Sequence, residues 1–226
     1  FYNVQGGRYR KLQISFGPPT LLFELVINYE DGTCTTVHSD NNWKYDFSPV
    51  TFNCIYGGED YDARREQKGW NQIGFDDSHW RPVVIQEAPK GILRPQMAAP
   101  VKIMERYDIQ KVTKLNADQV ASASVSTKRT VDLSAFVLDM GQNLAGFPEI
   151  TVRGKRGQKV TLIVAEALTD EGACNQRQTG RQHYYEYTLK GEGDETWHPR
   201  FSYYGFRYIQ VEGAVLKGQK NPQKLP

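Results

Sequence analysis

Short segments in which apolar and polar side chains alternate run along much of this chain of 226 residues. Residues 21–29 are the clearest case, with the side chains of one face at every second position: Phe23, Leu25, Ile27 and Tyr29. The pair Asp31-Gly32 comes next, and residues 33–37 are rich in β-branched side chains. An Asp-Gly pair between two such segments is typical of a β-hairpin, so the sequence predicts two paired strands here.

The same pattern recurs, and glycines separate the segments at short intervals. Further strands are predicted at residues 101–104, 159–165, 182–189 and 206–211. No long window has the period of an amphipathic helix, and we expect at most one or two helical turns, near residues 62–66 or 76–79. Many short strands with frequent turns favour an all-β fold made of β-sandwiches.

The segment at residues 91–100 separates two groups of predicted strands. It contains Pro95 and Pro100, and prolines interrupt regular secondary structure, so we expect a domain boundary there. Residues 217–226 are polar and basic and are predicted to form a linker to something downstream. The chain begins at Phe1 without a basic segment followed by an apolar core, so we expect a fragment or processed form that carries no signal peptide.

The charge composition limits the classes of partner. The sequence has 28 basic and 26 acidic residues, which give a net charge of +2. This is far from the strongly basic surface that binds nucleic acid or an anionic membrane. No segment approaches the roughly 18 consecutive apolar residues of a membrane-spanning helix. We therefore expect no nucleic-acid partner and no membrane partner.

The three cysteines are odd in number and widely spaced. No two of the three, Cys34, Cys54 and Cys174, form a CxxC pair, so the sequence does not favour a zinc site. Two alternatives stay open for these residues. Either Cys34 and Cys54, the nearest pair, form one disulfide, or all three side chains are reduced and partly buried thiols.

The densest group of charged side chains is at residues 57–66, with the sequence GGEDYDARRE. Calcium is bound by several oxygen ligands, and Glu59, Asp60 and Asp62 are of that chemical type, although their spacing is not diagnostic. A catalytic pair of carboxylates is a second interpretation. It is weakened for Glu59 and Asp60, because neighbouring residues of a strand point to opposite faces.

The third interpretation of this segment is structural, and it is the one we favour. Asp62 and Glu66 would pair with Arg64, Arg65 or other cations in a network of ion pairs. The sequence also contains no signature of a zinc protease, of a serine hydrolase or of a dinucleotide-binding loop. Catalysis is therefore the least favoured of the three interpretations.

Several short sequence motifs taken together show a family resemblance. In chain order they are SD at 39–40, WK at 43–44, IYGGEDYDAR at 55–64, GW at 69–70, FDDSHW at 75–80, LDMGQNLAG at 138–146, AEAL at 165–168, WHPRF at 197–201 and GFRY at 205–208. This order resembles the front part of bacterial α-L-rhamnosidases, which are inverting glycoside hydrolases. The resemblance covers about residues 3–213 and is specific only when the motifs are taken jointly.

The resemblance implies a definite layout. Residues 1–97 would be the later part of an N-terminal jelly-roll domain that lacks its first strands, and residues 98–213 a second, concanavalin-like β-sandwich. Residues 214–226 would lead to the (α/α)₆ barrel, which carries the catalytic carboxylates in this family and is absent here. We therefore expect no catalytic residue in this chain, and a partner in the barrel of the same polypeptide.

The resemblance also suggests where carbohydrate could be contacted. Asn143 and Arg207 would lie near the partner domain, and Trp70 is one of four tryptophans that could form a platform for a sugar; core packing is the alternative for each. The chain departs from the family pattern at Tyr185 and Tyr204, where relatives often have Asp and His.

Two functions follow from these observations. The first is a non-catalytic part of an α-L-rhamnosidase that supports the barrel and contacts rhamnose-containing glycans. The alternative is an autonomous module that binds rhamnose or another carbohydrate through calcium. Family analogy suggests a periplasmic or secreted protein, although we recognise no targeting signal in this sequence.

Overall fold

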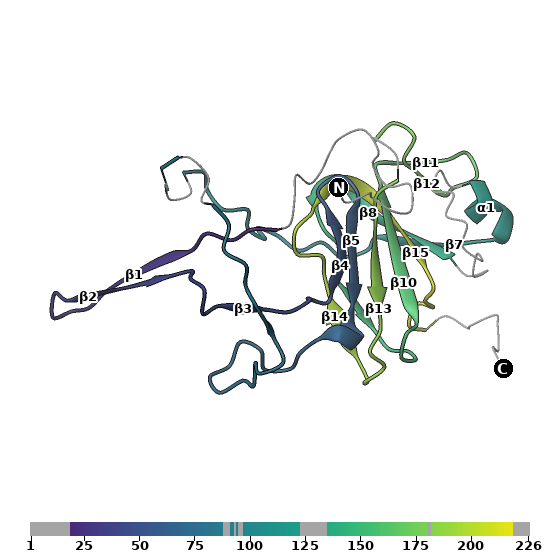
Figure 1. Ribbon diagram of the computed structural model, residues 1–226. Coiled ribbons are helices and arrows are strands. Elements are labelled where there is room, and N and C mark those ends of the chain that lie inside the picture. Colours follow the sequence, from purple (N-terminus) through teal and green to yellow (C-terminus); the bar gives the residue numbers. More distant parts are fainter. Residues whose placement is uncertain are drawn as a thin grey trace. The chain divides into compact units, whose positions relative to one another are not determined.

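The computed structural model describes residues 19–87, 91–92, 94, 97–122, 135–179 and 182–218 (Figure 1). Its regular structure is almost entirely β-strand, so the predicted all-β class is confirmed. The chain divides into two compact units, and each is described by itself. Unit 1 comprises the described residues of Ser15–Ser48 and Gln67–Val101, and unit 2 those of Pro49–Glu66 and Lys102–Pro226.

Unit 1 contains two small antiparallel sheets. Strands β1 (Glu24–Asn28) and β2 (Cys34–His38) form the predicted hairpin, and β3 (Lys44–Tyr45) pairs with β6 (Arg81–Pro82). The hairpin turn is held by the Asp31 carboxylate, which accepts hydrogen bonds from the backbone and the hydroxyl of Thr33. None of the described side chains of unit 1 is fully buried.

Unit 2 is built on a seven-stranded sheet with the order β4-β5-β13-β10-β15-β8-β7 (Figure 1). Its strands are β4 (Val50–Cys54), β5 (Gly58–Asp62), β7 (Lys111–Leu115), β8 (Ala135–Gly146), β10 (Lys159–Ala165), β13 (Tyr184–Thr188) and β15 (Tyr204–Glu212). All neighbours pair antiparallel except β5 and β13, which are parallel. Strand β10 matches its predicted bounds of 159–165 residue for residue.

One face of this sheet carries the main core. A second layer, formed by β9 (Ile150–Val152) and β14 (Glu195–Trp197), contributes Trp197 to that core. The largest side chains in the core are aromatic, and they come from β5, β8, β13, β14 and β15: Tyr61, Phe136, Tyr185, Tyr187, Trp197 and Phe206. Two layers that enclose one apolar core are the arrangement of a β-sandwich, as predicted.

Two smaller apolar clusters involve the short elements between the long strands. Helix α1 (Ala117–Ser122) contributes Val120 to the first cluster, together with Leu115 of β7. Strand β12 (Cys174–Asn175), which pairs with β11 (Ala167–Leu168), contributes Cys174 to the second. The Cys174 backbone N–H donates to the side-chain oxygen of buried Gln210, so this connection is tied to β15.

Several local predictions differ from the structure. Residues 101–104 are not a strand, and the strand of this region is β7. A helical turn does occur at 62–66, as the 3₁₀ helix η2 (Ala63–Arg65), whereas residues 76–79 form a turn without helix. The three cysteines are free thiols, so the alternative of a disulfide between Cys34 and Cys54 is not realised.

One junction between the compact units, at Val101/Lys102, lies near the predicted boundary, but the units are not divided there alone. Residues 49–66 belong to unit 2, because β4 and β5 are strands of its large sheet. At the other end, the side chains of Ala214, Val215 and Leu216 pack against the main core. The rest of the predicted linker, residues 219–226, lies outside the described residues, as do residues 1–18, on which the expected truncation depends.

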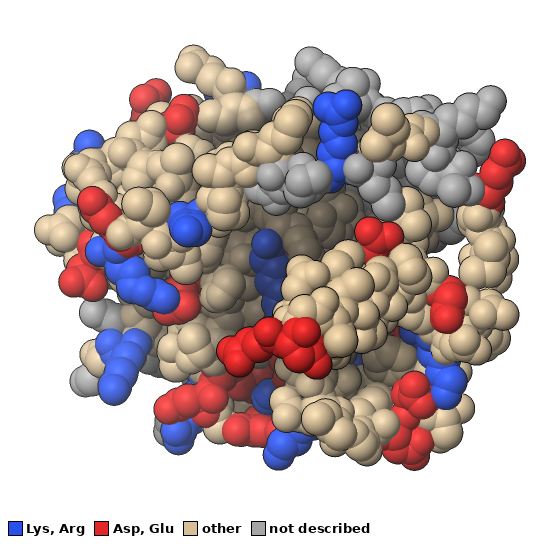
Figure 2. All heavy atoms as spheres, turned by 90° about the vertical axis from the view of Figure 1, so that its left-hand side faces the viewer, with Lys and Arg blue, Asp and Glu red and all other residues tan. Residues whose placement is uncertain are grey.

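The surface carries charges of both signs. Figure 2 shows acidic and basic side chains interspersed over one face, without a large area of a single sign. This agrees with the net charge of +2. Within the described residues, no helix has the length and apolarity needed to cross a membrane.

Candidate functional site

The acidic segment forms strand β5, which lies between β4 and β13. The backbone requires glycine at the first residue of β5. Gly58 has φ +98°, and a Cβ there would be 1.9 Å from the carbonyl oxygen of Tyr184. Gly58 therefore lets β5 approach β13 closely enough for parallel pairing. This close approach buries the acidic segment inside a sheet.

Alternation along β5 separates its carboxylates. Tyr61 is part of the main core and Glu59 pairs in register with Tyr185 of that core, so both lie on the core face. Asp60 and Asp62 belong to the opposite face. The structure thus does not bring the predicted calcium ligands Glu59, Asp60 and Asp62 together. In the part of the chain that is described, no group of three or more His, Cys, Asp or Glu side chains could hold a metal ion.

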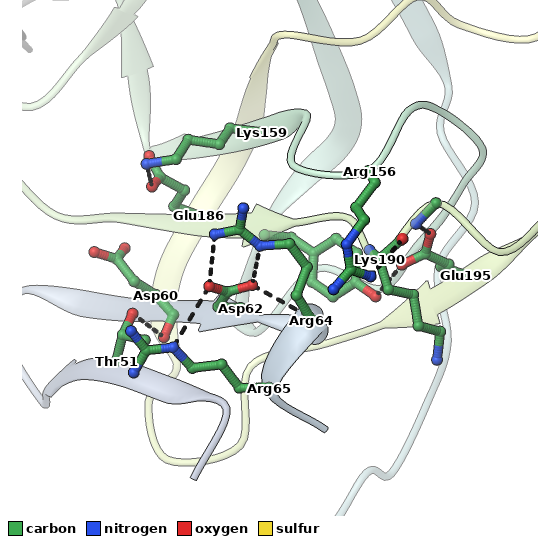
Figure 3. A network of polar contacts seen from close by, with 12 residues as sticks. Thr51, Asp60, Asp62, Arg64, Arg65, Arg156, Lys159, Glu186, Lys190 and Glu195 are labelled. Atoms are coloured by element: carbon green, nitrogen blue, oxygen red, sulfur yellow. Dashed lines mark hydrogen bonds and ion pairs between the residues drawn. The ribbon is translucent and has the colours of Figure 1, made fainter. Parts of the chain in front are cut away.

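Asp62 is held by arginines, as the structural interpretation proposes (Figure 3). Its carboxylate accepts two hydrogen bonds of 2.8 Å from the Arg64 guanidinium and one of 3.1 Å from the Arg64 backbone N–H, which caps η2. The Nε atom of Arg65 lies 3.6 Å from Asp62 Oδ2. The hydrogen bonds from the Arg64 side chain hold the pKa of Asp62 below its usual value. Glu66 pairs with another cation, because Lys190 Nζ lies 2.8 Å from its Oε2 atom.

Glu59 is fully buried, with 0% of its surface exposed. Its Oε2 atom accepts hydrogen bonds from Asn53 Nδ2 at 3.2 Å, from the Arg200 backbone N–H at 3.1 Å and from the Phe201 backbone N–H at 3.3 Å. Its Oε1 atom is buried and has no partner. Burial raises the pKa of Glu59, and the three hydrogen bonds only partly oppose that effect.

The motif at residues 138–146 lies in the last part of strand β8. Gly141 within it has φ +83°. Leu144 pairs with Phe206 and Asp139 with Tyr208, so residues 140–143 of β8 form a bulge opposite Arg207.

The two predicted contact residues of this region have different partners. Arg207 donates to both carboxylate oxygens of Asp139, at 2.8 and 2.9 Å. Asn143 instead donates to Glu166 Oε1 at 3.1 Å and is exposed. The hydrogen bonds from Arg207 lower the pKa of Asp139.

The aromatic candidates also have different surroundings. Trp70 lies in unit 1 and is 60% exposed, as a sugar platform requires. Trp197 is a core residue of unit 2. Tyr185 and Tyr204, where the family often has Asp and His, have ring centroids 5.7 Å apart, and Tyr185 is completely buried. At Tyr185 the chain thus has a core side chain where relatives often have an acid.

Comparison with known proteins identifies the family. Residues 1–105 match the family described as the α-L-rhamnosidase N-terminal domain, and residues 129–225 match the bacterial α-L-rhamnosidase concanavalin-like domain. The chain belongs to the bacterial α-L-rhamnosidase family. An α-L-rhamnosidase of Formosa agariphila is 35% identical over 90% of this chain, and one of Streptomyces avermitilis is 35% identical over 88%. The chain spans about a fifth of the length of these rhamnosidases, 20% and 18% respectively.

Solved rhamnosidases have the same fold over most of the chain. The α-L-rhamnosidase of Dictyoglumus thermophilum superposes with a TM-score of 0.73 at 31% identity, covering 88% of this chain and 21% of that one. The Streptomyces avermitilis α-L-rhamnosidase, described as complexed with L-rhamnose, gives a TM-score of 0.70 at 34% identity, covering 88% and 18%.

Proposed function

We propose that this chain is a non-catalytic β-sandwich part of an α-L-rhamnosidase and that it supports a catalytic (α/α)₆ barrel of the same polypeptide. The observation that carries the proposal is the coverage of the relatives. About nine-tenths of this chain aligns with the rhamnosidase of Formosa agariphila, but the alignment spans only 20% of that protein. The parts that match are an N-terminal domain and a concanavalin-like domain.

The chemistry of the described carboxylates supports the same conclusion. Glycoside hydrolysis by inversion needs one protonated and one ionised carboxyl group on either side of an accessible substrate. Glu59 has the raised pKa of a general acid, but its 0% exposure denies access to any sugar. Asp62 is ionised, but its oxygens are occupied by Arg64.

A turnover assay tests the absence of catalysis. The purified chain should release no aryl alcohol from an aryl α-L-rhamnoside, whereas the full-length Streptomyces avermitilis enzyme serves as the positive control. Turnover that is lost in Glu59→Ala and retained in Asp60→Asn would refute the proposal and would identify Glu59 as a catalytic residue.

A chimaera tests the supporting role. This chain would replace the aligned region of the Streptomyces avermitilis enzyme, with which it is 35% identical. We expect a folded chimaera with measurable rhamnosidase activity. The same chimaera carrying Trp197→Ala, which removes a core side chain, should lose activity together with its cooperative unfolding. A chimaera that folds and remains active with this defect would contradict a supporting role.

Carbohydrate contact is a second candidate, favoured by the exposure of Trp70. Its ring is 60% exposed, and a flat exposed indole is suited to stacking on a sugar. Asn143 and Arg207 are the polar candidates of unit 2. Titration with L-rhamnose, with and without calcium, should quench tryptophan fluorescence in the wild type but not in Trp70→Ala. An unchanged signal at millimolar rhamnose would exclude this candidate for Trp70.

A further inference from the structure

A short loop, residues 198–203, connects β14 to β15 and presents two aromatic side chains to solvent. Phe201 is 65% exposed and Tyr203 is 53% exposed, whereas Ser202 between them is 5% exposed. The side chains of the loop therefore alternate outward, inward and outward. The loop backbone is held by hydrogen bonds to side chains of β5 and β13.

Glu59 is the main anchor of this loop. Its Oε2 atom accepts hydrogen bonds from two consecutive backbone N–H groups of the loop, those of Arg200 and Phe201. The same oxygen accepts a hydrogen bond from Asn53 of β4. A second anchor is the Tyr185 hydroxyl, which donates to the Ser202 carbonyl at 3.3 Å. One carboxylate oxygen thus joins β4, β5 and the loop.

The anchor is incompletely satisfied. Glu59 Oε1 and the Ser202 hydroxyl oxygen are both buried, and neither has a hydrogen-bond partner. An unpartnered buried polar atom costs free energy, and the cost is much greater when the atom carries charge. The closed loop therefore tolerates a neutral Glu59 better than an ionised one, and exposure of Oε1 to water would remove the difference.

Three titratable side chains face Glu59, each from a different element. Arg200 of the loop lowers the pKa of Glu59, and its guanidinium lies 5.6 Å from the ring centroid of Tyr61 on β5. Tyr185 of β13 is the third, and a negative charge on Glu59 raises the pKa of both tyrosines. Both tyrosines are neutral near neutral pH, so Arg200 is the only charge that opposes burial among these three groups.

We propose that Glu59 is a proton-dependent switch for the 198–203 loop, which is closed on β5 when Glu59 is protonated and opens more readily when Glu59 is ionised. Opening breaks the hydrogen bonds to Oε2 and gives water access to both carboxylate oxygens. The exposed rings of Phe201 and Tyr203 then lose their fixed position. The switch thus controls how the loop presents its aromatic surface, whatever that surface contacts.

Thermodynamic linkage gives the sign and size of the effect. The pKa of Glu59 is raised above its ordinary value of 4.5 in the closed form. Hydration in the open form returns it towards that value, so ionisation favours opening. The opening equilibrium constant should rise by about tenfold for each unit by which the closed-form pKa exceeds the open-form pKa.

Amide hydrogen exchange, followed by NMR on the full chain from pH 5 to pH 8, tests the switch. After correction for intrinsic exchange, protection of the Arg200 and Phe201 amides should fall as pH rises through the pKa of Glu59. Glu59→Gln should remove this dependence. Glu195→Gln, at another buried glutamate of unit 2, should retain it. Protection that is independent of pH in the wild type, or equally dependent in Glu59→Gln, would overturn the proposal.

A second measurement needs no variant. The carboxyl ¹³C resonance of Glu59 in the labelled wild-type chain reports its titration directly. We expect a midpoint above 4.5, coincident with the change in protection of the two amides. A midpoint at or below 4.5, or one well separated from the change in protection, would refute the switch even if the Glu59→Gln variant failed to fold.

Discussion

Among the buried glutamates of unit 2, Glu59 and Glu195 have pKa values that shift in opposite directions. Glu195 is 4% exposed and Glu59 is 0% exposed, and Glu59 lies deeper in the protein. Both oxygens of Glu195 have donors: Oε2 accepts from the Tyr187 hydroxyl and the Lys190 N–H, and Oε1 accepts from the Gly191 N–H. Glu59 has donors on one oxygen only. The two glutamates thus differ both in depth of burial and in the distribution of donors over their two oxygens, and both differences act in the observed directions.

The pKa shifts follow from these differences. Burial acts to raise the pKa of Glu195, but the N–H groups of Lys190 and Gly191 and the Tyr187 hydroxyl outweigh it, and the pKa is lowered. At Glu59 burial prevails over a similar number of donors, and the pKa is raised. Glu195 therefore stabilises the fold above pH 4.5 and loses that contribution as the pH falls through its folded pKa. Glu59 stabilises it below 4.5 and loses that contribution as the pH rises.

The largest expected effect comes from Gly58→Ala, which should disturb Glu59 and leave Glu195 intact. The new Cβ would meet the Tyr184 carbonyl, so β5 must move away from β13, at a cost of about 3 kcal/mol or more in unfolding free energy. Urea denaturation measures the loss, and the pKa of Glu59 should fall as water enters.

The matched control for that variant is Gly193→Ala. Gly193 has φ +94°, close to the +98° of Gly58, but nothing lies within 4 Å of its added Cβ. Gly193→Ala should lower the free energy of unfolding by only about 1 kcal/mol, because alanine is strained in this backbone conformation but meets no other atom. Equal losses for the two variants would show that the close approach of β5 to β13 contributes nothing.

Removal of the Glu195 or the Glu59 carboxylate should cause the next largest losses in the free energy of unfolding. Glu195→Ala leaves three donors without an acceptor and should cost about 3 kcal/mol. Glu59→Ala also leaves three donors, but it removes an oxygen that had no partner, so its cost should be about 1 kcal/mol smaller. Urea denaturation at pH 7 compares the two. A larger loss for Glu59→Ala would contradict the assignment of Oε1 as an unsatisfied atom.

The pH dependence of stability should separate the two residues by sign, with a smaller effect. Glu59→Gln should remove a decline in unfolding free energy that the wild type shows as the pH rises above 4.5. Glu195→Gln should instead remove a decline that appears as the pH falls below 4.5. Denaturation midpoints measured from pH 3 to pH 8 distinguish the two profiles, and identical profiles for the two variants would invalidate the comparison.

The smallest effect is expected for Asp62→Asn. Asparagine retains an acceptor for the Arg64 backbone N–H and is itself a good helix cap, so only the charge is lost. Arg64 is largely exposed, and ion pairs with exposed partners contribute little. The denaturation midpoint should shift less than for Glu195→Ala, and less still in high salt. A shift as large as that of Glu195→Ala would mean that the charge of Asp62 is structurally essential.

Local features of the fold could be predicted from the sequence. The alternation of apolar side chains located β10 and the hairpin of β1 and β2, because those signals are contained within a few neighbouring residues. Helix α1 was missed although it carries a recognisable signal. Asn116 and Gln119 exchange hydrogen bonds between side chain and backbone, and this reciprocal cap is visible in the sequence as Asn, two residues, then Gln.

The candidate site was harder to predict, because its partners are distant in the chain. Strand β5 has acidic residues at Glu59, Asp60 and Asp62 and therefore does not have the pattern of a buried strand. What buries Glu59 is the pairing of β5 with β13 and the amides of Arg200 and Phe201. No local pattern specifies these contacts. Asp62 was interpreted more accurately because its partners are its own neighbours.

The pairing of β5 with β13 also limits how such proteins can be divided. Strands β4 and β5 fall within residues 1–105, the region matched to the N-terminal family, whereas β13 falls within residues 129–225, the region matched to the concanavalin-like family. Recombination between the two matched regions would leave β13 as an open sheet edge, which invites pairing with other chains. Exchange of one matched region without the other would therefore break this strand pairing, even though the two regions match separate family models.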